Sequence, residues 1–111
     1  MAASVLNGKP VQFVSTAGWS EKYGGLEGAM YIKIALDCLT KHPVDMLVFE
    51  QPKDGVLQVR SAGYDLATDS KLDETTIIFS TKSLPVQKFW LKIDRNEEGN
   101  YVGTFLFPDE Y

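Results

Sequence analysis

Cys38 and His42 are the only cysteine and the only histidine of the chain, and they stand four residues apart. On a helix this spacing puts two side chains one turn apart on the same side, where a thiolate and an imidazole could act as nucleophile and general base. Cys38, however, falls among apolar positions, and a free cysteine in that setting is usually a small core residue. We therefore expect Cys38 in the core, His42 near the end of a helix, and no catalytic residue.

A run of carboxylates follows in the second half of the chain, where Asp65, Asp69 and Asp73 recur every four residues and Glu74 comes next. Such carboxylates on one helix face would attract a divalent cation, but the segment lacks the alternating oxygen ligands of a calcium loop. We interpret it as a solvated acidic connection. A structural zinc site needs four nitrogen or sulfur ligands, and the chain has one cysteine and one histidine. The sequence predicts neither a metal nor a cofactor.

Glycines at 24, 25 and 28 surround the start of a helical pattern. Glycines at a helix start let backbone N–H groups approach an anion, and Lys22 would add a positive charge. The run matches neither the P-loop nor the dinucleotide-binding fingerprint, and Glu27 would repel a phosphate. We favour a flexible turn in which Gly28 lets the helix approach a sheet closely.

Trp90 stands between Lys88 and Lys92 in a segment of alternating character. Apolar residues occupy positions 89, 91 and 93, so they face the core and Trp90 faces outward with the two lysines. An exposed Trp buries a large area with few rotamers to freeze, which is typical of a protein interface. Alternatively, the lysine stems simply cover Trp90 on an ordinary wet face.

A second candidate surface is the glycine-rich segment 17–25, which we predict to be a loop. It carries Trp19, Lys22 and Tyr23, which we expect to be exposed and available to a partner.

We expect one helix and several strands to carry these residues. Helical spacing runs from Leu26 to about Lys41 and ends before Pro43. A broad arc of this helix is apolar, which indicates burial on more than one flank: Ala29, Tyr31, Ile32, Ile34, Ala35, Leu36, Cys38 and Leu39.

Strand-like runs precede and follow this helix, at 11–15, 44–50, 56–61, 75–81, 86–94 and 100–107. Consecutive strands joined by short turns pair antiparallel. The sequence therefore predicts an α+β fold, in the order β-α-β-β-β-β-β, with a single helix packed on one face of a five- to six-stranded, mainly antiparallel meandering sheet.

Length and composition set the remaining bounds. The 111 residues suit a single domain, 1–111, and 44% apolar and 23% charged residues exclude intrinsic disorder. One cysteine forms no internal disulfide, and we see neither a secretory signal nor a membrane span, so we expect a cytoplasmic protein. The net charge of −4 disfavours nucleic acid as a partner.

The leading functional hypothesis is a small, non-enzymatic protein-binding module, such as an inhibitor, an immunity-type protein or an adaptor. It would act through an aromatic and basic surface at Trp90, Lys88 and Lys92, or at Trp19, Lys22 and Tyr23. The alternative is a small-molecule pocket between the helix and a curved sheet, entered past Gly24 and Gly25 and lined by Tyr31 and Ala35. An enzyme or a single-strand nucleic-acid binder is less favoured, and a homodimer formed by edge pairing stays open.

Overall fold

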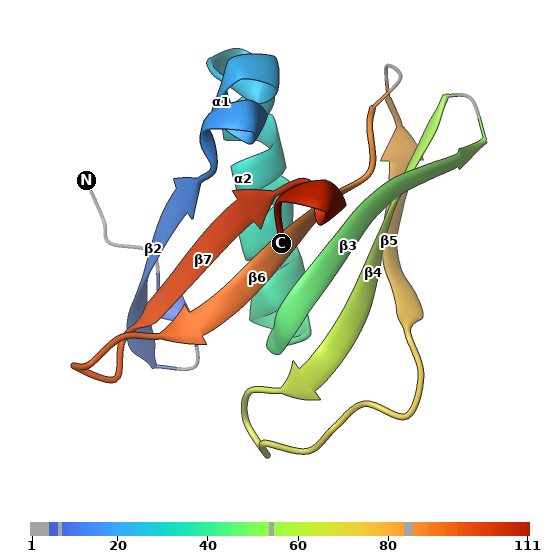
Figure 1. Cartoon of the computed structure of the whole chain (residues 1–111). Coiled ribbons are helices and arrows are strands. Elements are labelled where there is room, and N and C mark those ends of the chain that lie inside the picture. Colours follow the sequence, from blue (N-terminus) through green and yellow to red (C-terminus); the bar gives the residue numbers. More distant parts are fainter. Residues whose placement is uncertain (1–4, 7, 54, 84–85) are drawn as a thin grey trace.

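The computed structural model describes residues 5–6, 8–53, 55–83 and 86–111, which form one twisted sheet with two helices on one face (Figure 1). In chain order the elements are β1 (Val5–Leu6), β2 (Lys9–Ser15), α1 (Ala17–Tyr23), α2 (Leu26–Lys41), β3 (Val44–Lys53), β4 (Val56–Asp65), β5 (Thr76–Lys82), β6 (Phe89–Arg95) and β7 (Tyr101–Leu106), followed by a 3₁₀ turn, Pro108–Glu110. The predicted α+β class is confirmed.

The strand order across the sheet is β1-β2-β7-β6-β3-β4-β5. All neighbours are antiparallel except β2 and β7, which run parallel. The first and last long strands of the chain therefore lie side by side. In Figure 1, α2 lies behind the middle of the sheet, between the β2–β7–β6 half and the β3–β4–β5 half.

The predicted meander is wrong at one connection, because β6 pairs with β3 and not with its predecessor β5. Strands β5 and β6 therefore form no hairpin, and β6 lies on the other side of β3. It is held there by α1: the Gln87 N–H donates to the Tyr23 hydroxyl at 2.9 Å, and Lys22 Nζ donates to Gln87 Oε1 at 3.0 Å.

The predicted single helix has a second helix beside it, because the segment that we expected to be a loop contains α1. Thr16 caps it, since its side-chain oxygen accepts a hydrogen bond from the Trp19 N–H at 3.3 Å. Trp19 and Tyr23 stand one helical turn apart on the inner side, and each is only 3% exposed. Tertiary burial of this apolar pair outweighs the weak helix propensity of the neighbouring glycines.

The long helix α2 has the predicted bounds, and its apolar arc faces the sheet, with Ala35 and Leu39 fully buried. Gly28 lies where α2 meets the end of α1: a Cβ at this position would stand 2.3 Å from the Tyr23 carbonyl oxygen. Only glycine allows this approach, so Gly28 makes room for α1 and not, as predicted, for the sheet.

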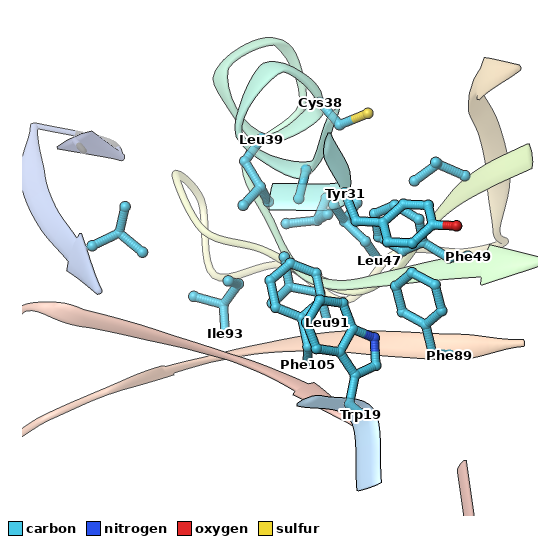
Figure 2. Close-up of a cluster of buried hydrophobic side chains, with 14 of the residues drawn as sticks. Trp19, Tyr31, Cys38, Leu39, Leu47, Phe49, Phe89, Leu91, Ile93 and Phe105 are labelled. Carbon is cyan, nitrogen blue, oxygen red and sulfur yellow. The ribbon is translucent and has the colours of Figure 1, made fainter. Parts of the chain in front are cut away.

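Aromatic rings form the centre of the core, between the helices and the inner face of the sheet (Figure 2). Trp19 of α1 stacks on Phe105 of β7 at a centroid distance of 4.6 Å, and Phe49 of β3 stacks on Phe89 of β6 at the same distance. Tyr31 of α2 meets Phe89 edge-on at 5.1 Å. These contacts join both helices to the central strands.

Candidate functional site

The outward-facing side of the sheet carries Trp90, as predicted. Phe89, Leu91 and Ile93 of β6 are buried, while Trp90 and Lys92 between them are only half-buried. Through the strand registers Trp90 belongs to a row that crosses five strands, which we call the outer row: Leu106, Trp90, Val48, Arg60 and Ile77. Register partners lie on the same face and touch. The outer row is apolar except for Arg60.

The C-terminal turn adds a second aromatic ring to the outer row. Tyr111 meets Trp90 edge-on at 5.7 Å and is 76% exposed. The turn itself is anchored by Glu110, whose Oε1 accepts hydrogen bonds from the Phe107 N–H at 2.9 Å and from the Thr16 hydroxyl at 2.7 Å. These two bonds hold the pKa of Glu110 below its ordinary value.

The charges beside the outer row are paired within the protein. Lys92 Nζ lies 3.1 Å from Asp45 Oδ2, and Arg60 Nε lies 2.6 Å from Glu50 Oε1. These pairs neutralise Arg60 and Lys92, the second of which we expected to make the face basic together with Lys88. Lys88 precedes β6 and is exposed, and no ion pair joins it to another residue that the structure describes. The surface is therefore aromatic and apolar with a mostly neutral border.

Asp45 also links this border to the backbone of β4. Its Oδ1 accepts a hydrogen bond from the Tyr64 N–H at 2.7 Å. A Cβ on Gly63, whose φ is +78°, would stand 1.9 Å from the same oxygen. A side chain at position 63 would thus displace the carboxylate that pairs with Lys92.

The second predicted surface, at Trp19, Lys22 and Tyr23, does not exist as an aromatic patch. Trp19 and Tyr23 belong to the core, because α1 turns both rings toward the sheet. Lys22 alone is exposed, and it bonds Gln87. The prediction of exposed rings failed because we took this segment for a loop. A loop has no helical periodicity, so nothing marked one side of the segment as buried.

The predicted position of the ligand pocket, at Tyr31 and Ala35, is wrong, because the space between helix and sheet is filled there. Tyr31 and Ala35 face the sheet with exposed fractions of 2% and 0%, and the rings of Phe49 and Phe89 lie against Tyr31 (Figure 2). Burial raises the pKa of Tyr31 to about 12. Gly24 and Gly25 lie exposed in the short connection between the two helices.

A hollow between helix and sheet does exist farther along α2, but none of the residues that we expected to line a pocket borders it. It measures about 390 Å³ and lies between the last turns of α2 (Asp37, Cys38, Thr40, Lys41 and His42) and two residues of β5 (Ile78 and Phe79). We call it the α2–β5 groove. Only the tertiary structure brings these two segments together, since nothing in either pattern marks the other as its neighbour.

Cys38 and His42 both border this groove, but the burial of the thiol does not suit a nucleophile that His42 would activate as a base. Cys38 is 4% exposed, as predicted for a core thiol. Burial raises its pKa to about 11, and the nearby Asp37 carboxylate adds to the increase. His42 is exposed, and its backbone N–H closes the helix on the Cys38 carbonyl at 2.8 Å. A thiol that stays protonated at neutral pH is a poor nucleophile.

In the acidic connection after β4, two of the carboxylates already have partners within the protein. Asp65 Oδ1 accepts hydrogen bonds from the N–H groups of Ala67 and Thr68, and Asp69 pairs with Arg95 at 3.5 Å. Within the described ranges, no three histidine, cysteine or acidic side chains are grouped so that they could hold a metal ion. None of the helices in the described part of the chain is long and apolar enough to cross a membrane.

Comparisons with known proteins add no relative: no family model, no curated protein and no solved structure matches this chain.

Proposed function

We propose that this chain is a protein-binding module that docks another protein on the outer row and Tyr111. The observation that carries the proposal is the row itself: half-buried Trp90 and Val48 and 44%-exposed Ile77 lie across one sheet face, opposite the face that the helices cover. Apolar side chains on an uncovered sheet face bury further area when a second protein packs on them.

The chemistry of the border narrows the kind of partner. Because Asp45 and Glu50 neutralise Lys92 and Arg60, a partner gains little from opposite charge at those positions. It gains most from apolar or aromatic side chains that pack against Trp90, with polar groups at the margin. An inhibitor or an adaptor with a preformed surface fits this description, and the lone reduced thiol suits a cytoplasmic location.

The test is a comparison of Trp90→Ala, Tyr111→Ala and the control Leu26→Ala in pull-downs from the native host. Leu26 is 91% exposed on α2, at the helix-covered side of the sheet. We expect a partner captured by the wild type and by the Leu26 variant to be reduced at least about tenfold with Trp90→Ala, a typical loss for an aromatic anchor.

Thermal unfolding of each variant checks that the fold is intact, and hydrogen exchange of the purified complex locates the contact. Protection on β3 and β6 around Val48 and Trp90 would support the outer row. Equal capture by the Trp90, Tyr111 and Leu26 variants would overturn the assignment, as would protection confined to the helices.

A further inference from the structure

The carboxylate of Glu110 ties the C-terminal turn to the start of α1. Its Oε1 accepts hydrogen bonds from the Thr16 hydroxyl at 2.7 Å and from the Phe107 N–H at 2.9 Å. The Glu110 N–H donates to the Phe107 carbonyl at 2.9 Å, which closes the turn on itself. Thr16 is fixed in its own place, because its N–H donates to the Phe105 carbonyl at 3.0 Å. The turn is therefore held on a support formed by the end of β7 and the cap of α1.

Gly18 leaves room for this carboxylate against α1. A Cβ at position 18 would stand 2.7 Å from Glu110 Oε2, closer than a side-chain carbon approaches an oxygen. Glycine lowers the helix propensity of α1 at this position. Alanine would favour the helix and displace the carboxylate, so an experiment can separate the two effects.

The residue that follows Glu110 carries the most exposed ring of the docking surface, by which we mean the outer row together with Tyr111. The Tyr111 ring meets Trp90 edge-on at 5.7 Å, although 76% of the residue is exposed. A side chain exposed to this degree is held weakly by its own packing. Its position against Trp90 thus depends on the backbone that precedes it, and Glu110 fixes that backbone.

From these observations we infer that Glu110 is the positioning residue of the docking surface, because it holds the C-terminal turn so that Tyr111 lies against Trp90 before any partner arrives. A partner then meets a preformed pair of rings and does not have to order Tyr111 itself, which lowers the entropic cost of binding. The consequence for binding rests on the function proposed above, whereas the positioning of the ring does not.

The decisive variants change Thr16 and keep the cap of α1, since aspartate and asparagine both cap helices well. Thr16→Asp puts a second carboxylate beside Glu110, whereas the amide of Thr16→Asn can donate a hydrogen bond to it. Glu110→Ala removes the carboxylate itself, and Asp109→Ala removes the neighbouring charge of the same turn as the matched control. Gly18→Ala displaces the carboxylate while it favours the helix. Each variant is measured as the full chain without a partner.

The readout is the nuclear Overhauser effect between the ring protons of Tyr111 and Trp90, assigned with Tyr111→Ala and Trp90→Ala. We expect this effect in the wild type, in Asp109→Ala and in Thr16→Asn, and its loss in Glu110→Ala, Thr16→Asp and Gly18→Ala. The indole N–H signal of buried Trp19 should keep its wild-type position in Glu110→Ala and Thr16→Asp, because only the turn moves.

Absence of the effect in the wild type overturns the inference, and so does an effect that persists in Glu110→Ala. Equal loss in Thr16→Asp and Thr16→Asn would also overturn it, because the charge would then not matter. A shift of the Trp19 signal in Glu110→Ala would show a general structural role and not a positioning one.

Partner capture is then compared between Thr16→Asp and Thr16→Asn. We expect capture by Thr16→Asp to be about twofold to tenfold weaker, as for one side chain that the partner must order. If the rings separate in Thr16→Asp and capture stays unchanged, the positioning by Glu110 holds and the proposed docking surface is wrong. The two failures are thereby distinguished.

Discussion

Cys38 shows how burial decides the chemistry of a residue whose spacing from His42 suggests a nucleophile and its base. The thiol lies on α2 at the wall of the α2–β5 groove and is almost fully buried. Burial raises its pKa to about 11. Its thiolate is therefore scarce at neutral pH, although the imidazole that would deprotonate it lies one helical turn away.

We predict that Cys38 reacts with a disulfide reagent at pH 8 at least about a hundredfold more slowly in the folded protein than in the denatured chain. Two units of pKa lower the thiolate population by that factor, and restricted access adds to it. Absorbance of the thiolate that the reagent releases measures the reaction rate and checks this prediction, with the denatured chain as the reference. Fast reaction of the folded protein would instead indicate an accessible thiolate and return Cys38 and His42 to consideration as a catalytic pair.

At the scale of elements, the C-terminal turn holds the start of α1 against the end of β7. Glu110 reaches the hydroxyl of Thr16, which in turn caps α1 through the Trp19 N–H, and it also accepts from the Phe107 N–H. A Cβ on Gly18 would stand 2.7 Å from the same carboxylate. One side chain thus joins the C-terminal turn to the start of α1, which lies 94 residues earlier in the sequence at Thr16.

We predict that Glu110→Gln lowers the melting temperature at pH 7 and that this difference vanishes in acid. The folded state depresses the pKa of Glu110, so its carboxylate stabilises the fold above the unfolded value of 4.5, and the contribution is lost as pH falls through the folded value. Melting temperatures of both proteins from pH 7 downward provide the measurement. Glu97→Gln removes the same charge on an exposed loop and serves as the control. A deficit for Glu110→Gln that stays constant across this range would contradict the role of the ionised carboxylate.

At the scale of the whole molecule, stability concentrates in the middle of the sheet. β6 lies between β7 and β3, and its Phe89 and Leu91 are fully buried. Among the strands that the structure describes, β5 has a neighbour on one side only, and its residues are half-buried or exposed. Backbone hydrogen bonds inside the core open only with global unfolding, whereas those at an edge open locally.

We therefore predict that backbone amides of β3, β6 and β7 exchange slowest with solvent deuterium, and that those of Ser80 and Lys82 exchange fastest among strand residues. The N–H groups of Ser80 and Lys82 point to the open edge, because these residues alternate with those that bond to β4, such as Ser83, which donates to the Gly55 carbonyl. Hydrogen exchange followed by NMR, on the chain alone at low concentration, measures both groups. Protection of Ser80 equal to that of Leu91 would mean that the β5 edge is already covered, which would contradict an open edge.

Local pattern was sufficient for several features of this protein. The period of two in β6 correctly separated Phe89, Leu91 and Ile93 from Trp90 and Lys92, and helical spacing correctly bounded α2. These predictions hold because side-chain direction repeats with the backbone geometry of each element and needs no knowledge of its neighbours. The α+β class follows from the same periodicities.

Tertiary structure decided the rest. Trp19 and Tyr23 show helical spacing too, but their segment forms a helix because the aromatic core buries both rings. Lys92 looked like a free cation, yet it pairs with Asp45, 47 residues away. The pairing of β6 with β3 and the α2–β5 groove likewise join distant segments. Periodicity in a sequence tells which side of a strand or helix is buried. The choice of neighbour depends on the packing of all elements at once, and the outer row depends on that choice.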